Sequence, residues 1–272
     1  MGATCYMNVI LQCFVHNPLL RNFYLGDGHQ SSECERKNCM SCAMEAVFQD
    51  FYAVDVTTGY CASGVLASFW LSKRKAYDEL SSTQEQDAHE FFQFLTEELH
   101  EINSHGGRLS ETPSKKAKHN HDPDCKCIVH QTFYGKLQST IKCQACGDIN
   151  SSFESFVDIS LGLDVLVKKK NLKAAPLTLQ GCLDEEYIKS EACDYSCNSC
   201  PTNKATKQLS IKSLPNTLCI QLKVGPLSFL LISPFLRMMN NMTLYPAHSD
   251  AQVAIAENAY QHSDSRPCLS IY

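Results

Sequence analysis

Cysteine and histidine side chains gather in three groups whose spacing is typical of metal ligands. The groups are His29, Cys34, Cys39 and Cys42; Cys125, Cys127 and His130; and the two C-x-x-C pairs Cys143/Cys146 and Cys197/Cys200. Thiolates and imidazoles are the ligands of tetrahedral zinc. Because four protein ligands leave no open position for water, the sequence predicts up to three structural Zn²⁺ sites rather than a catalytic metal.

Two of these ligand sets leave alternatives open. The second group lacks a fourth ligand nearby in the sequence; the candidates are His100, His105, His119 and His121. Cys193 competes for a place beside the pair Cys197/Cys200. The competing interpretation, that the cysteines are small buried apolar residues, is weak for the C-x-x-C pairs, because buried thiols have no reason to pair in polar turns.

One further cysteine stands in a different setting. The chain begins MGATCYMNVILQC, and Cys5 precedes an apolar run with helical spacing that stops before Asn17-Pro18. At the N-terminus of a helix, free backbone N–H groups and the helix dipole stabilise a thiolate, the reactive form of cysteine. Cys5 is therefore a candidate nucleophile, with a plain structural thiol as the alternative. The sequence does not show which histidine would lie near it as a base.

Composition restricts the class of protein. The 272 residues are 44% hydrophobic and 19% charged, which is typical of one or two globular domains. The net charge of −5 argues against direct nucleic-acid binding. No signal peptide is visible, and the longest apolar stretch, Val224 to Leu236, is interrupted by two prolines, so no membrane association is expected. Sixteen cysteines without a secretion signal indicate a reducing compartment, the cytosol or the nucleus.

The order of the predicted elements favours an α+β fold. Helical spacing covers residues 7–15, 44–52 and 88–102, and strand alternation covers residues 157–163, 209–211 and 218–222. Helices first and strands later are typical of α+β proteins. The polar, basic stretch 106–124 predicts a mobile loop. Cys13 and Cys219 lie in apolar runs and are expected in the core.

Several segments together resemble the ubiquitin-specific protease family, peptidase C19. GATCYMNVILQC is similar to its cysteine box, QEQDAHEFFQFL at 84–95 to its QQDAHEF segment, and SLPNTLCIQLK at 213–223 to a strand of its palm. The C-x-x-C pairs are similar to the zinc-bearing fingers of the family. The group that begins at His29 and the segment CKCIVHQTFYGKLQSTIKC at 125–143 resemble the branch that supplies the histone-deubiquitinating subunit of the SAGA coactivator.

The resemblance implies a papain-like cysteine protease with thumb, palm and fingers. Cys5 would attack the isopeptide carbonyl that follows the C-terminal glycine of ubiquitin, and Asp87 would help to hold the ubiquitin tail. His89 would be structural, and His100 would complete the second zinc site. The implied partners are ubiquitin, a ubiquitinated protein such as histone, and SAGA-type adaptor subunits, which suggests a nuclear location.

The resemblance also divides the chain. It implies a helical thumb over residues 1–104, a linker loop at 105–124, fingers and a partial palm at 125–223, and a tail at 224–272 that does not match. We expect the tail to be unstructured and the apolar edge at 218–222 to be unpaired, which would leave the palm incomplete and the isolated chain poorly soluble.

Two catalytic groups of the family have no counterpart in the sequence. The family has an asparagine five residues before its nucleophile, and a Gly-His motif with the catalytic base after its palm strand. The tail has only His248 and His262, neither in a Gly-His pair. We therefore expect a splice variant or gene-model fragment truncated at both ends and inactive as written. The alternative function is a non-catalytic, zinc-stabilised adaptor that binds ubiquitin or coactivator subunits.

Overall fold

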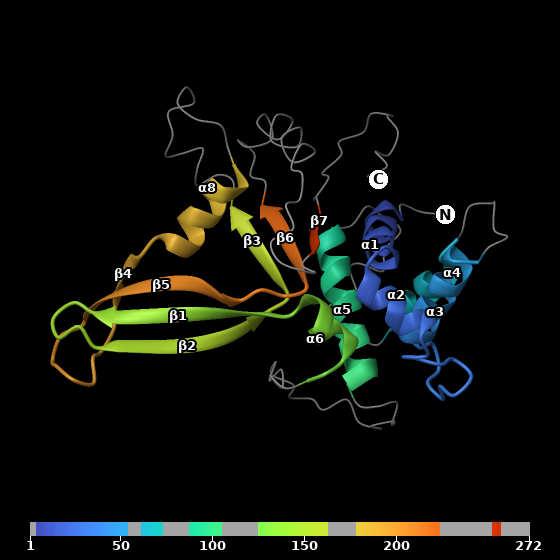
Figure 1. The fold of residues 1–272 in the computed structure, drawn as a ribbon, viewed down its shortest axis with the longest axis horizontal. Coiled ribbons are helices and arrows are strands. Elements are labelled where there is room, and N and C mark those ends of the chain that lie inside the picture. The colour runs from blue at the N-terminus through green and yellow to red at the C-terminus, as the bar shows by residue number, and fades with distance from the viewer. Residues whose placement is uncertain are drawn as a thin grey trace.

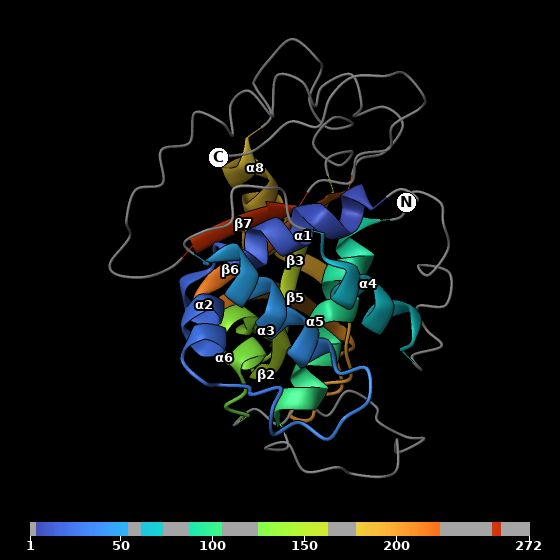
Figure 2. The same ribbon diagram turned by 90° about the vertical axis from the view of Figure 1, so that its right-hand side faces the viewer.

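Helices form one end of the molecule and strands the other (Figure 1). The computed structural model describes residues 4–53, 61–72, 87–104, 125–162 and 178–223, together with the strand at 252–256. The helical end contains α1 (Cys5–Val15), α2 (Pro18–Leu25), α3 (Met40–Phe51), α4 (Ser63–Trp70), α5 (Ala88–Ser104) and α6 (Ile128–Phe133). Figure 2 shows these helices together in front of the strands.

The long helix α5 lies at the centre of the helical core. Its side chains Phe91, Phe94, Leu95 and Leu99 have no exposed surface. Helix α1 packs on it with the side chains that the helical spacing predicted: Met7, Ile10, Leu11, Phe14 and Val15 are buried. The predicted helices at 7–15, 44–52 and 88–102 are thus confirmed as α1, α3 and α5.

The Asn17-Pro18 step ends α1 and also begins α2. The Asn17 side chain accepts hydrogen bonds from the N–H groups of Leu19 and Leu20, and Pro18 occupies the first helical turn, where a missing N–H costs nothing. The amide of Asn17 also donates to Thr217 Oγ1 at 2.9 Å, and both side chains are buried. One side chain therefore caps a helix and joins it to a strand 200 residues away.

Replacement of Asn17 by alanine is expected to lower the free energy of unfolding by about 2–3 kcal/mol, because a cap and a buried hydrogen bond are lost together. The thermal midpoint should fall accordingly, as measured by circular dichroism. The control is Gln12→Ala, whose side chain is hydrogen-bonded to exposed His16 on the surface of α1. An equal effect of both variants would contradict the proposed double role of Asn17.

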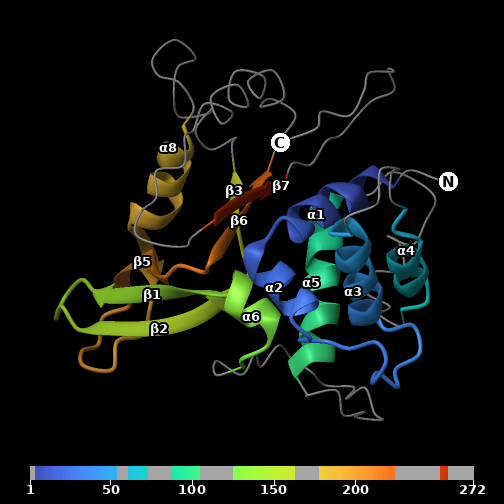
Figure 3. The ribbon, with the colours of Figure 1, turned by 45° about the vertical axis from the view of Figure 1, so that its right-hand side comes forward.

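The strands form two sheets. The first has the order β2-β1-β5-β4 and is antiparallel throughout; the second has the order β3-β6-β7 and is parallel. Their bounds are β1 (Gly135–Cys143), β2 (Ile149–Phe156), β3 (Asp158–Gly162), β4 (Glu191–Asp194), β5 (Lys204–Ser213), β6 (Thr217–Lys223) and β7 (Gln252–Ala256). Figure 3 shows the parallel sheet between the helices and the antiparallel sheet, which extends away from them like fingers.

Two short helical segments, α8 (Leu179–Leu183) and the π-helix η2 (Asp184–Ile188), precede β4. The side chains of Leu179 and Cys182 pack with Ile159, Leu161 and Ile220 in a second core beside the parallel sheet. The strands predicted at 157–163, 209–211 and 218–222 are confirmed as β3, β5 and β6, and the α+β class is confirmed with them. None of the helices within the described residues is long and apolar enough to cross a membrane.

The structure corrects two expectations. Strand β7 pairs in parallel with β6, with Thr217 opposite Gln252, so the tail is not unstructured over 252–256 and the edge of β6 is not unpaired there. The physical reason is that an unpaired edge presents free backbone N–H and C=O groups, and the backbone of β7 pairs with them. Cys13 is exposed rather than part of the core, whereas Cys219 is buried as expected.

Some predicted features lie outside the described residues. These are the loop at 105–124 with His105, His119 and His121, and the rest of the tail at 224–272 with His248 and His262.

Candidate functional site

The structure brings the predicted metal-binding side chains together in three clusters. They are His29, Cys34, Cys39 and Cys42; His100, Cys125, Cys127 and His130; and Cys143, Cys146, Cys197 and Cys200. In each cluster the four potential ligand atoms lie within 4.8 Å of one another. Each cluster contains four nitrogen or sulfur donors, which is the donor set of structural zinc.

The four-cysteine cluster lies at the end of the antiparallel sheet. The Sγ atoms of Cys143 and Cys200 are 3.6 Å apart, as are those of Cys146 and Cys197. Two thiolates at about 2.3 Å from a tetrahedral zinc ion are about 3.8 Å apart, so these separations fit the ion. They are also far too long for a disulfide bond, which is about 2.05 Å.

Two tight turns present these four thiols. Gly147 adopts a positive φ of 75° after Cys146, and its N–H donates to the carbonyl of Cys143, which closes the first turn. In the second turn the N–H of Ser199 donates to Cys197 Sγ at 3.4 Å. Cys193 is not in the cluster: it lies within β4, paired with Ala205 of β5. Cys193 is therefore not among the four cysteines that the structure brings together here.

Backbone donors prepare one of these thiols for a cation. The N–H group of Cys146, and after it that of Ala145, lower the pKa of Cys143 to about 6. A lowered pKa favours the thiolate, and a thiolate is the form of cysteine that binds metal.

The second cluster joins α5 to α6. His100 Nδ1, from α5, lies 3.3 Å from Cys127 Sγ and 3.9 Å from Cys125 Sγ, and His130 Nδ1 lies 3.2 Å from Cys127 Sγ. Among the four histidines considered for this place, His100 is the one that the described residues show at the cluster. Burial raises the pKa of Cys127 to about 12, so a bound cation is needed to keep this sulfur ionised at neutral pH.

The first cluster lies where the loop after α2 meets α3. Cys39 is the N-cap residue of α3, and Cys42 lies in its first turn. His29 Nε2 reaches them from the loop, 3.2 Å from Cys42 Sγ and 3.8 Å from Cys39 Sγ. Burial lowers the pKa of His29, which favours the neutral imidazole that can bind a metal ion.

Sequence reasoning missed Glu45, which supports this loop. Its side chain is buried in α3, and Oε2 accepts the backbone N–H of Ser31 at 2.8 Å, while Oε1 accepts from Gln49. The sequence did contain a signal for this role, because Glu45 is a carboxylate on the apolar face of the predicted helix, three residues after Cys42. Its hydrogen bond fixes the loop between His29 and Cys34.

The candidate nucleophile Cys5 is exposed and is the first residue of α1. The side chain of Thr4, the N-cap residue, makes no capping hydrogen bond, so the helix dipole and the N–H groups of the first turn are directed toward the start of the helix. Tyr6, the next residue, packs edge-on against Phe91 of α5 with 5.6 Å between ring centroids. Within the described residues, no histidine side chain forms a hydrogen bond with Cys5.

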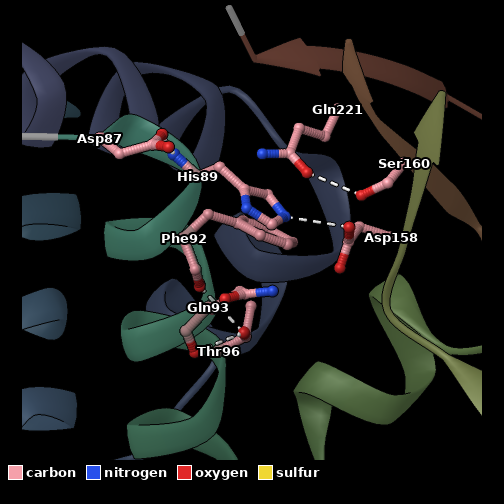
Figure 4. Close-up of polar contacts among 8 residues, drawn as sticks. All are labelled: Asp87, His89, Phe92, Gln93, Thr96, Asp158, Ser160 and Gln221. Carbon is pink, nitrogen blue, oxygen red and sulfur yellow. Dashed lines mark hydrogen bonds and ion pairs between the residues drawn. The ribbon is translucent and has the colours of Figure 1, made fainter. Parts of the chain in front are cut away.

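Asp87 lies at the start of α5 (Figure 4). Its Oδ1 accepts the N–H of His89 at 2.7 Å, which makes Asp87 the N-cap of the helix. His89 does not reach Cys5; its Nε2 lies 2.9 Å from Asp158 Oδ2 on β3. The starts of α1 and α5, with Cys5 and Asp87, are held together by the contact between Tyr6 and Phe91.

Comparison with known proteins relates this arrangement to a family. The family model described as "Ubiquitin carboxyl-terminal hydrolase" matches residues 1–227. "Probable ubiquitin carboxyl-terminal hydrolase 8" of Schizosaccharomyces pombe is 34% identical over 224 residues, which cover 82% of this chain and 43% of the relative. Ubiquitin C-terminal hydrolase 22 of Arabidopsis thaliana is 32% identical, with 82% of this chain and 41% of the relative covered.

The fold is similar to solved structures of the same family. Ubp8, in the SAGA DUB module with Sgf11, Sus1 and Sgf73 bound to monoubiquitin, aligns with a TM-score of 0.62 and 32% identity. The alignment covers 82% of this chain and 46% of Ubp8. The same module bound to ubiquitin aldehyde gives a TM-score of 0.61. The chain spans less than half the length of these relatives. On the match over residues 1–227, this chain belongs to the ubiquitin carboxyl-terminal hydrolase family, as a ubiquitin-specific protease similar to Ubp8 of SAGA.

Proposed function

We propose that the chain is part of the catalytic domain of a cysteine-type deubiquitinase, with Cys5 as the nucleophile. The observation that carries this proposal is the exposed thiol at the first turn of α1, in a fold similar to that of Ubp8 in complex with ubiquitin. In this reaction Cys5 Sγ attacks the carbonyl carbon of the C-terminal glycine of ubiquitin. A thioester forms, the lysine amine leaves with a proton, and water then hydrolyses the thioester.

The other components follow from the same family relationship. Asp87, at the start of α5 beside the Cys5 region, is proposed to hold the ubiquitin tail. The three clusters are proposed to bind structural Zn²⁺, which would fix the loop after α2, the junction of α5 with α6, and the end of the fingers. The proposed substrate is ubiquitinated histone in the nucleus, with adaptors of the Sgf11, Sus1 and Sgf73 type as partners, because Ubp8 is found in a module with those subunits.

A second function has one observation in its favour. Within the described residues no histidine side chain forms a hydrogen bond with Cys5, and His89, which the resemblance makes structural, is bonded to Asp158. A chain with a ubiquitin pocket but no base would bind ubiquitin or coactivator subunits without turnover. This non-catalytic adaptor is the alternative to the hydrolase.

The test is reaction of the purified, zinc-loaded chain with ubiquitin that carries an electrophile at its C-terminus. Intact-mass spectrometry should show one added ubiquitin on the wild type and none on Cys5→Ala. The matched control is Cys61→Ala, which removes another exposed thiol and should leave the adduct unchanged. Absence of the adduct on the wild type would overturn the assignment of Cys5.

Release of a fluorophore from the C-terminus of ubiquitin separates the two functions. Release that depends on Cys5 supports the hydrolase. Adduct formation or ubiquitin binding without release supports the adaptor. A chain that shows neither binding nor release contradicts both.

A further inference from the structure

A hydrogen bond between the side chains of His89 and Asp158 connects the helical end of the molecule to the parallel sheet, as Figure 4 shows. His89, in the first turn of α5, places Nε2 2.9 Å from Oδ2 of Asp158, the first residue of β3. The two side chains are only 12% and 16% exposed. We propose that this pair positions the first turn of α5, and with it Asp87, for binding of the ubiquitin tail. The inference rests on the proposed function and adds two positioning residues to it.

The helical side of the pair is held in place by packing. The imidazole of His89 lies over Phe92 with 6.5 Å between centroids and an angle of 25° between the rings. Phe92 is buried and packs edge-on against Phe14 of α1 and Phe133 of α6. The orientation of the His89 ring is therefore set by the aromatic core, and a shift of α5 would move the ring away from Asp158.

The strand side of the pair depends on His89. Asp158 lies opposite Cys219 of β6 in the sheet. Burial, and then the charge of Asp158, raise the pKa of Cys219, and burial with the charges of Glu186 and Asp158 raises the pKa of Tyr187 to about 12. These two neighbours stay uncharged at neutral pH and do not balance the carboxylate. The hydrogen bond from His89 stabilises that negative charge.

The pair is linked to both proposed functional residues. The backbone N–H of His89 donates to Asp87 Oδ1, and Phe91, two residues further on, packs against Tyr6 beside Cys5. Loss of the pair would let the first turn of α5 leave its bound position for part of the time. The apparent affinity for ubiquitin then falls in proportion to the fraction that remains competent to bind.

The experiment compares variants on the two sides of the pair. His89→Phe and Asp158→Ala each break it, their double mutant tests coupling, and Asp158→Asn keeps an acceptor oxygen. The matched control is Ser160→Ala, which changes a residue of the same strand as Asp158 and removes the 2.6 Å hydrogen bond from Ser160 on β3 to Gln221 on β6 (Figure 4). The measurements are KI and kinact for the ubiquitin electrophile at Cys5, and hydrogen exchange of the peptide at 87–95.

We expect KI to rise about tenfold in each pair-breaking variant, because about one tenth of the molecules would then be competent to bind ubiquitin. The rate constant kinact should stay near the wild-type value. The double mutant should be no worse than the single mutants, Asp158→Asn should be intermediate, and Ser160→Ala should be unchanged. Additive effects in the double mutant, or an equal rise in KI for Ser160→Ala, would overturn the proposal.

Hydrogen exchange keeps this proposal separate from the proposed function. If the wild type does not react with the electrophile, the assignment of Cys5 fails, and exchange alone decides the role of the pair. Faster exchange at 87–95 in His89→Phe and Asp158→Ala, but not in Ser160→Ala, supports the positioning role. Equal protection in all variants overturns it.

Discussion

Replacement of Cys200 by serine is expected to remove one zinc ion from the folded protein and to unfold the end of the antiparallel sheet. Cys200 pairs with Cys143 across two turns that are 57 residues apart in the sequence. Around them, β2 has mostly exposed side chains and β4 is only 4 residues long, so apolar burial contributes little there. Structural zinc contributes about 10–16 kcal/mol in zinc-finger peptides, which is large beside the total stability of a domain.

Native mass spectrometry should count three zinc ions on the wild type and two on Cys200→Ser, and hydrogen exchange should rise over 143–149 and 191–206. The matched control is Cys193→Ser, which changes a thiol of β4 that is outside the four-cysteine cluster. It should keep three ions and wild-type protection. Loss of zinc from Cys193→Ser, or an unchanged count in Cys200→Ser, would contradict the ligand set drawn from the structure.

Replacement of Phe91 by alanine is expected to lower the free energy of unfolding by about 3–5 kcal/mol. Its ring has no exposed surface and packs against three other rings, those of Tyr6, Phe69 and Phe94, at centroid distances of 5.5–6.1 Å. The cavity would lie directly behind the turn that presents Cys5. We therefore expect slower reaction of Cys5 with the ubiquitin electrophile as well as a lower melting temperature.

Phe153→Ala is the matched control for Phe91→Ala. It removes the same side chain from β2, where the ring is 60% exposed, and should change stability by less than about 0.5 kcal/mol. Thermal unfolding of the two variants under the same conditions gives the comparison. A similar loss in both would show that α5 is not the centre of the core.

Local sequence determined the features that depend on one segment of the chain. The apolar spacing after Cys5 predicts α1 because a helix returns every third or fourth side chain to one face. The C-x-x-C pairs predict turns for a local reason too. Two thiols three residues apart converge on one ion if the backbone between them turns. Cys5 at a helix start, α5 and the strands β3 and β6 are all of this kind.

Tertiary structure decided what depends on segments distant in the sequence. It brought His100 to the second cluster and left Cys193 out of the four-cysteine cluster, because the path of α5 and the register of β4 with β5 set which side chains meet. It paired His89 with Asp158, 69 residues away, and placed β7 on the edge of β6. No spacing rule within a segment contains this information, because these contacts follow from how helices pack and strands pair across long distances in the sequence.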